Sequence, residues 1–291
     1  MKIRIGTRES RLAVVQTELA AERLRQVYPE LELEIVPMKT TGDRILHKTL
    51  DKIGGKGLFV KELDMALLEG RIDLAVHSLK DMPMEENPEI PVLAYSARED
   101  VRDVLVLPQG VQELDPAKPV GCASPRRALQ FQALYPGVRV EPVRGNLQTR
   151  LRKLDEGQFS ALILAAAGLR RLGLEERIFR IFSPEEMLPA AGQGILAVQG
   201  RADLDPACLA GWGDPDSRDC ALAERAFVRM LGGGCSSPVA AYATTAGETL
   251  TLHGLYVTPE DQMVRGTVCG PRTQGPDLAA GLARRLKEEL A

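Results

Sequence analysis

A cysteine behind three consecutive glycines is the strongest chemical signal in this sequence. Cys235 lies in the segment LGGGCSSP, which spans residues 231–238. Because glycine adopts positive φ without steric cost, such a turn can expose one side chain at close range. The same glycines could instead end a helix predicted over residues 220–231 and be followed by an inert, buried thiol. This segment alone leaves both interpretations open.

Arginine is concentrated in the middle of a chain that is acidic overall. Residues 126–180 hold eleven Lys or Arg against five Asp or Glu, whereas the whole chain has a net charge of -3. Arginine binds carboxylates and phosphates through paired hydrogen bonds, and helix N-termini also favour anions. A single arginine could be a solvated surface residue, but the group predicts a cleft that binds a polyanion. The polar residues at predicted strand-to-helix junctions are Arg8, Ser10, Arg126, Arg127, Arg144, Asn146 and, one turn later, Arg150.

Three further motifs could take part in chemistry. The segment GGKGLF at residues 54–59 lacks the spacing of a phosphate-binding loop, and we interpret it as a flap that carries Lys56 and Phe59 over a cleft. Asp81 directly follows a predicted strand, where its carboxylate could also be a simple turn or helix cap. The segment AAGQG at residues 190–194 would let a ligand approach the backbone closely, or it could form a hinge.

Predicted strands and helices alternate through the first two-thirds of the chain. Such βαβ alternation predicts two lobes, each with a mostly parallel sheet and helices on both faces. In these folds ligands bind beyond the carboxyl ends of the strands. The predicted strands span residues 2–7, 31–38, 73–79, 104–107, 120–123, 138–143 and 161–166, and the predicted helices span residues 10–28, 58–69, 125–134 and 147–154.

The rest of the chain predicts a hinge and a third domain. A strand at residues 195–199 follows the second lobe and could return to the first, which would make a hinge of two crossovers. Antiparallel strands at residues 239–244, 249–258 and 263–269 and a helix at 277–290 then predict a small α+β domain. The predicted domains are residues 1–96 with 195–212, residues 97–194, and residues 213–291.

The composition argues against several classes of function. With 44% hydrophobic and 26% charged residues the chain resembles an ordinary globular protein, and no apolar run approaches the roughly 20 residues that span a bilayer. An aromatic content of 4% and the acidic net charge disfavour nucleic acid as a partner. Three histidines and five cysteines without a CxxC pair give a metal site little to build on. The odd number of widely spaced cysteines and the strand-like first residues predict a protein of the reducing cytoplasm.

Taken together, these motifs resemble the porphobilinogen deaminase family, also called the hydroxymethylbilane synthases. The shared segments occur in the family's order over nearly the whole chain. They are GTRES at residues 6–10, GGKGLFVKEL at 54–63, DLAVHSLKDMP at 73–83, SPRR at 124–127, RGNLQTRL at 144–151, AGLRRLGL at 167–174, LPAAGQG at 188–194 and GGC at 233–235.

The resemblance implies a fold and an activity. The fold is a pair of periplasmic-binding-protein-like α/β lobes with a two-crossover hinge, plus a small C-terminal α+β domain. The activity is a deaminating transfer that condenses four porphobilinogen molecules head to tail into linear hydroxymethylbilane, in tetrapyrrole and haem biosynthesis. Growth takes place on one covalent dipyrromethane cofactor per chain, attached through a thioether to the cysteine that matches Cys235. We expect a cytoplasmic monomer that acts on porphobilinogen without metal, membrane or nucleic acid.

The resemblance also implies roles for individual residues. Asp81 matches the catalytic aspartate, whose carboxylate can stabilise a developing cation and transfer a proton. Lys56 and Phe59 match flap positions. The residues that match cofactor contacts are Lys80, Asp81, Ser124, Arg126, Arg127 and Arg144, and those that match substrate contacts are Arg8, Ser10, Arg144, Arg150, Arg171 and Gln193.

One segment departs from the family pattern. Where a Thr-Ser-Ser-Leu-Arg-Arg-like segment is expected, this chain has CASPRR at residues 122–127, so two hydroxyl groups that would contact cofactor carboxylates are missing. Cys122 adds a second thiol near the predicted cleft, but it lacks the glycine turn of Cys235. Pro125 is suited to begin a helix, so the turn itself is expected to form.

Two other functions fit parts of the pattern. A non-catalytic two-lobe binding protein could close on an anionic ligand with the same hinge, but it would need neither Cys235 nor Asp81. Nucleic-acid binding by the arginine surface would predict a salt-sensitive affinity for DNA or RNA.

Overall fold

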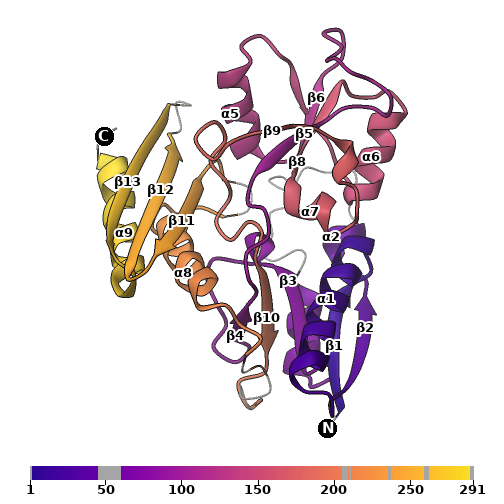
Figure 1. The fold of residues 1–291 in the computed structure, drawn as a ribbon, viewed down its shortest axis with the longest axis vertical. Coiled ribbons are helices and arrows are strands. Elements are labelled where there is room, and N and C mark those ends of the chain that lie inside the picture. Colours follow the sequence, from indigo (N-terminus) through magenta and orange to yellow (C-terminus); the bar gives the residue numbers. More distant parts are fainter. Residues whose placement is uncertain are drawn as a thin grey trace.

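The computed structural model describes residues 2–44, 60–204, 209, 211–234, 237–258 and 262–288. Three sheets organise these residues, two with five strands and one with three (Figure 1). In Figure 1 the sheet that contains the N-terminus lies at the bottom, the second five-stranded sheet at the top, and the three-stranded sheet to one side. The predicted pair of α/β lobes with a small C-terminal domain is therefore confirmed.

The first sheet has the strand order β2-β1-β3-β10-β4. Its first three strands are parallel, and β10 is antiparallel to both of its neighbours. The strands are β1 (Lys2–Arg8), β2 (Glu32–Met38), β3 (Leu74–Ser78), β4 (Val92–Tyr95) and β10 (Leu196–Gly200), and the helices between them are α1 (Arg11–Val27), α2 (Thr41–Arg44), α4 (Lys61–Leu68) and the 3-10 turn η1 (Leu79–Asp81).

The second sheet has the order β7-β6-β8-β5-β9 and repeats this plan. Strands β7, β6 and β8 are parallel, and β5 is antiparallel to β8 and β9. The strands are β5 (Asp103–Val106), β6 (Val120–Cys122), β7 (Val140–Pro142), β8 (Ala161–Ala165) and β9 (Ile178–Ile181), and the helices are α5 (Pro125–Leu134), α6 (Leu147–Asp155), α7 (Ala166–Arg170) and the 3-10 turn η2 (Glu175–Arg177).

The chain crosses between the lobes twice. Residues 96–102, the first crossover, lead from β4 into β5, and residues 188–195, the second crossover, lead into β10. The strand that follows each crossover lies between the parallel strands and an edge strand of its new sheet, and it is antiparallel to both neighbours. The prediction that residues 195–199 return to the first lobe is confirmed, because β10 pairs with β3 and β4.

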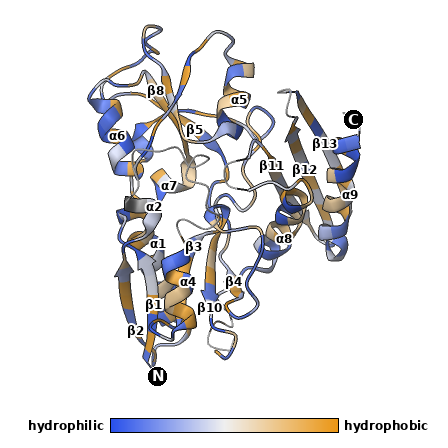
Figure 2. Ribbon diagram, turned by 180° about the vertical axis from the view of Figure 1, so that it is seen from behind, coloured by the Kyte–Doolittle hydropathy of each residue, from blue (hydrophilic) through white to orange (hydrophobic). Residues whose placement is uncertain are grey.

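Helix starts follow ordinary capping chemistry. Ser10 caps α1 by accepting a hydrogen bond from the backbone N–H of Ala13, and Asn146 caps α6 by accepting one from Thr149. Pro125 is the first residue of α5, where its missing N–H costs nothing. In Figure 2 α6 is largely hydrophilic, in keeping with a helix that covers the sheet from the solvent side.

The third domain is a three-stranded antiparallel sheet with two helices. Gly254 is required at the contact between sheet and helix, because a Cβ atom there would lie 2.4 Å from the ring of Phe227. Phe227 is fully buried at the centre of this domain's core. The elements are α8 (Pro215–Met230), β11 (Ala240–Ala246), β12 (Thr249–Val257), β13 (Met263–Pro271), the 3-10 turn η4 (Arg272–Gln274) and α9 (Gly275–Glu288).

Two strands were absent from the prediction. Both β4 and β9 are only four residues long and lie at a sheet edge. Residues along β9 alternate between half-buried and exposed, so its hydrophobic pattern is too short to distinguish it from a loop. Neither omission changes the predicted position of the site, because the site was predicted at the carboxyl ends of other strands.

Candidate active site

One large cavity, of about 920 Å³, lies where the two lobes and the third domain meet. Among the described residues that line it, eight are Lys or Arg and two, Glu9 and Asp81, are acidic. The structure therefore brings the predicted cationic residues to one place. The predicted site residues that line the cavity are Arg8, Ser10, Lys80, Asp81, Ser124, Arg126, Arg127, Arg144, Arg150, Arg171 and Gln193.

Three helix N-termini open onto this cavity. The cap residues of α1, α5 and α6, which are Ser10, Ser124 and Asn146, all line it. Backbone N–H groups and the helix dipole make such termini favourable for anions. The Ser124 hydroxyl makes no capping hydrogen bond, so it is available to a ligand. The helix N-termini thus attract anions in addition to the positively charged arginines beside them.

Lys80 and Asp81 lie together on η1, directly after β3. The Lys80 ammonium donates a hydrogen bond to Gln193 Oε1 at 3.2 Å. Burial, followed by the nearby charge of Arg127, lowers the pKa of Lys80 to about 8. The negative charge of Asp81 stabilises the charged forms of Lys80, Arg127 and Arg150, so its carboxylate lies within the electrostatic reach of all three.

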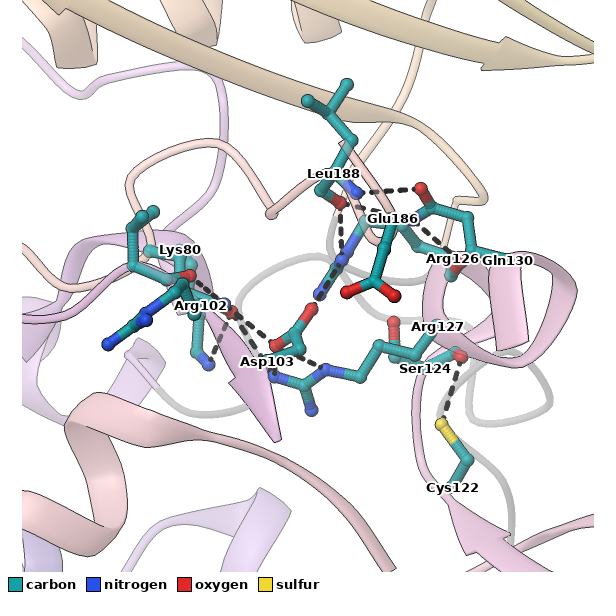
Figure 3. Close-up of polar contacts among 12 residues, drawn as sticks. Lys80, Arg102, Asp103, Cys122, Ser124, Arg126, Arg127, Gln130, Glu186 and Leu188 are labelled. Carbon is teal, nitrogen blue, oxygen red and sulfur yellow. Dashed lines mark hydrogen bonds and ion pairs between the residues drawn. The ribbon is translucent and has the colours of Figure 1, made fainter. Parts of the chain in front are cut away.

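A buried carboxylate, Asp103, anchors the arginine pair at the start of α5. Figure 3 shows Asp103 between Arg126 and Arg127, with distances of 2.8 Å to Arg126 Nη1 and 2.7 Å to Arg127 Nη2. Arg126 also donates to the carbonyl of Leu188 at 2.6 Å. Burial alone would raise the pKa of Asp103, but the two guanidinium groups hold it well below its ordinary value. The pair is therefore fixed in place before any ligand binds.

We expect Asp103→Asn to destabilise the protein by about 3–5 kcal/mol, because it leaves two buried guanidinium groups without their counter-charge. The free energy of unfolding in urea measures this effect. Glu141→Gln is a matched control, since its ion pair with Arg139 is half exposed and such pairs contribute at most about 1 kcal/mol. Equal losses in the two variants would contradict the anchoring role of Asp103.

Arg150 and Arg171, unlike Arg126 and Arg127, are hydrogen-bonded to backbone carbonyls and not to a carboxylate. Arg150 Nε donates to the Gly145 carbonyl at 2.8 Å, and Arg171 Nη2 donates to the Gly194 carbonyl at 2.6 Å. Within the described residues, neither forms an ion pair with a carboxylate. Burial lowers the pKa of each to about 10. Both guanidinium groups therefore gain from an anionic ligand in the cavity.

Three predicted site residues lie outside the described residues: Cys235, Lys56 and Phe59. Gly234 and Ser237, on either side of the Cys235 segment, line the cavity and hydrogen-bond to each other. The other thiol of interest, Cys122, is buried, and its Sγ donates to the carbonyl of Ser124 at 3.3 Å (Figure 3). Burial raises the pKa of Cys122, which disfavours the reactive thiolate.

The sequence analysis missed two groups at this site. Asp103 lies one residue before the strand predicted at residues 104–107 and was not singled out, because its partners are distant in sequence. Gln16, on α1, is buried, lines the cavity and donates to Ser78 Oγ at 3.0 Å. A lone carboxylate at the start of an otherwise apolar strand was the available signal for Asp103.

Two features are absent from the described part of the chain. It contains no helix with the length and apolar character needed to cross a bilayer. Over the same residues, no three His, Cys, Asp or Glu side chains are grouped so that they could bind a metal ion.

Comparison with known proteins covers nearly the entire chain. The family model "Porphobilinogen deaminase, dipyromethane cofactor binding domain" matches residues 3–208, and "Porphobilinogen deaminase, C-terminal domain" matches residues 219–290. The porphobilinogen deaminase of Acetivibrio thermocellus is 55% identical over 286 residues, which cover 98% of each chain. That of Alkaliphilus oremlandii is 55% identical over 289 residues, or 99% of this chain and 98% of that protein.

Likeness to solved structures is weaker. The periplasmic aliphatic sulphonate binding protein SsuA from Escherichia coli is 13% identical, with a TM-score of 0.42, over 78% of this chain and 70% of that one. A likeness this distant carries no information on function. The two family models and the full-length relatives, in contrast, agree with the motifs and with the cationic cavity. The chain belongs to the porphobilinogen deaminase family.

Proposed function

We propose that this chain condenses four porphobilinogen molecules head to tail, with release of ammonia, into linear hydroxymethylbilane. One observation carries this proposal: a cavity of about 920 Å³ whose described lining residues include eight Lys or Arg and two acidic residues. Every pyrrole ring of the substrate carries an acetate and a propionate, so a growing chain of rings is a polyanion. Cationic side chains and helix N-termini are the groups that bind such a ligand.

The cavity's donor set fits pyrrole ligands that carry carboxylates, which include both the substrate and the dipyrromethane cofactor of the family. Arg150 and Arg171 are partly buried cations bonded to backbone carbonyls, and carboxylates of a pyrrole ligand would supply the missing counter-charge. When bound, the cofactor supplies a pyrrole α-carbon as the point of growth. The residues proposed to hold it are Lys80, Asp81, Ser124, Arg126, Arg127 and Arg144.

Attachment of one cofactor per chain through a thioether to Cys235 is part of the proposal. The thiolate is a soft nucleophile toward a pyrrole that has lost its amine, and the resulting thioether resists hydrolysis. Gly234 and Ser237 support this assignment, because both flank the Cys235 segment and line the cavity. Cys122 is disfavoured by its burial and raised pKa.

Asp81 is the proposed catalytic residue. Its carboxylate can accept hydrogen bonds from pyrrole N–H groups and stabilise the cation that forms as porphobilinogen loses its amine. In its protonated form the same group can give a proton to the departing amine, and as a carboxylate it can later accept the proton from the α-carbon, which restores the acid. Its place on η1, beside Lys80, supports this role because both line the cavity between the lobes.

Carboxylates of the incoming substrate are proposed to bind the remaining polar residues. Arg8 and Ser10 lie at the start of α1, while Arg144 and Arg150 lie at the start of α6. Substrate between these two groups would therefore contact both lobes. Arg171, on the second lobe, is proposed to act with them.

The other predictions from sequence stay part of this proposal. They comprise domain boundaries at residues 96/97, 194/195 and 212/213, a flap that carries Lys56 and Phe59, and a cytoplasmic monomer that needs no metal, membrane or nucleic acid. The positions of the three sheets in the chain support the domain division. Movement of the lobes and flap during growth would let successive rings pass Asp81.

An assay with porphobilinogen tests the proposed activity. We expect the purified, cofactor-loaded chain to consume porphobilinogen and release four ammonia molecules for each hydroxymethylbilane. A non-catalytic binding protein would instead bind porphobilinogen and leave its concentration unchanged. Binding without ammonia release, in protein that carries the cofactor, would overturn the proposed function.

A further inference from the structure

The second crossover contacts all three parts of the molecule. The Leu188 carbonyl accepts from Arg126 of the second lobe, and the Ile195 carbonyl accepts from the backbone N–H of Leu79 in the first. The Pro189 carbonyl accepts from the N–H of Ala241 in the third domain at 3.2 Å. A shift of this segment would therefore change its contacts with both lobes and with the third domain.

Gln193 lies at the centre of this segment and is fully buried. Its Nε2 donates to the Val101 carbonyl at 2.7 Å and to Asp103 Oδ1 at 2.8 Å. Its Oε1 accepts from Lys80 Nζ and from Arg127 Nη2, each at 3.2 Å. These four bonds use both N–H groups and both lone pairs of the amide. The side chain therefore has no hydrogen-bonding capacity left for a substrate carboxylate.

The third domain also hydrogen-bonds to the second crossover. The backbone N–H of Gly192 donates to the fully buried carboxylate of Glu224 at 2.7 Å, and Arg98 of the first crossover pairs with that carboxylate at 2.8 Å. Gly192 has φ +72°, and a Cβ atom there would lie 2.7 Å from Leu79. Only glycine lets the segment approach η1 this closely. Contacts with the two lobes and with the third domain thus fix the position of Gln193.

We propose that Gln193 is a positioning residue, which holds Lys80 of the first lobe in register with Arg127 and Asp103 of the second. This inference rests on the proposed function, and it replaces direct substrate binding as the role of Gln193. Lys80 and Arg127 contact the ligand's carboxylates, and Gln193 sets the spacing between them. Losing that spacing misplaces the ligand relative to Asp81, and misplacements of about 1 Å can cost on the order of 10²-fold in rate.

Gln193→Glu is the sharpest test because it keeps the shape of the side chain and changes its charge. The new carboxylate faces Asp103, which repels it, and Lys80, whose ammonium it stabilises. Gln199→Glu is the matched control: Gln199 is also buried and bonded, to His77 and the Ile90 carbonyl, but does not line the cavity. Both variants are prepared with cofactor bound.

Two measurements are made on the wild type and both variants. In ¹³C-lysine NMR titrations, with the Lys80 signal identified by its loss in Lys80→Arg, we expect Gln193→Glu to raise the Lys80 midpoint by about 1–3 pH units. We expect kcat/KM for porphobilinogen to fall on the order of 10²-fold. Gln199→Glu should leave the Lys80 midpoint unchanged and kcat/KM within about tenfold of the wild type.

Each alternative outcome contradicts the inference. An unchanged Lys80 midpoint in Gln193→Glu, or a shifted midpoint with wild-type kcat/KM, would overturn it. If Gln193→Glu does not fold, Gln193→Asn withdraws the amide by one methylene without adding charge, and wild-type kcat/KM in that variant would overturn the inference. An inactive wild type would instead count against the proposed function, while the titration would still test the contact with Lys80.

Discussion

Replacing Asp81 with asparagine is expected to lower kcat for porphobilinogen consumption by about 10²- to 10⁴-fold. The amide keeps the size of the side chain but can neither stabilise a developing cation nor accept a proton. Two acidic residues belong to the described lining of the cavity, and of these Asp81 is the one that lies beside Lys80. Asp81 also lies within electrostatic reach of Arg127 and Arg150, which are proposed to bind ligand carboxylates. Steady-state kinetics on cofactor-loaded protein measure the loss.

The matched control for this variant is Glu89→Gln. Glu89 is an exposed carboxylate eight positions later in the same lobe and does not line the cavity. Its replacement removes the same charge, so we expect kcat to stay within about twofold of the wild type. A kcat for Asp81→Asn within tenfold of the wild type would exclude a central role for this carboxylate.

Replacing Cys235 with alanine is expected to abolish both the covalent cofactor and the activity. Without the thiol no thioether can form, and a primer held only by ion pairs would leave together with the product. Ammonia release from porphobilinogen should then fall to the background of the assay. Intact-protein mass should equal the mass of the unmodified sequence.

Cys122→Ala is the matched control for the cysteine variant. Cys122 directly precedes Ala123 and Ser124, which line the cavity, and it is buried with its Sγ bonded to the Ser124 carbonyl. Its replacement should keep the added mass and the activity. Retention of the cofactor by Cys235→Ala, or its loss from Cys122→Ala, would show that attachment takes place elsewhere.

Much of the fold could be predicted because local signals and hydrophobic periodicity agree. Pro125 begins α5 as predicted, and Ser10 caps α1. The buried run at residues 195–199 came after a complete second lobe, and its return to the first lobe as β10 is the simplest way to bury it. The edge strands β4 and β9 were missed because four residues carry too little pattern to recognise.

The charged residues of the site could be predicted, but their mutual arrangement could not. Arginines at strand-to-helix junctions converge because the carboxyl ends of parallel strands meet at one edge of a sheet. In contrast, the bonds of Asp103 to Arg127 and Gln193 join residues 24 and 90 positions apart. Such pairs depend on the tertiary fold and leave no periodic trace in the sequence. Gln193 was accordingly predicted as a substrate ligand, whereas its amide is fully bonded to protein.

Intact-protein mass spectrometry of the purified chain tests most directly whether the cationic cavity holds a pyrrole primer. We expect the mass to exceed that of the sequence by two linked pyrrole units, and peptide mapping to locate the addition on Cys235. A chain without this addition that also fails to turn over porphobilinogen after cofactor reconstitution would contradict the proposed function.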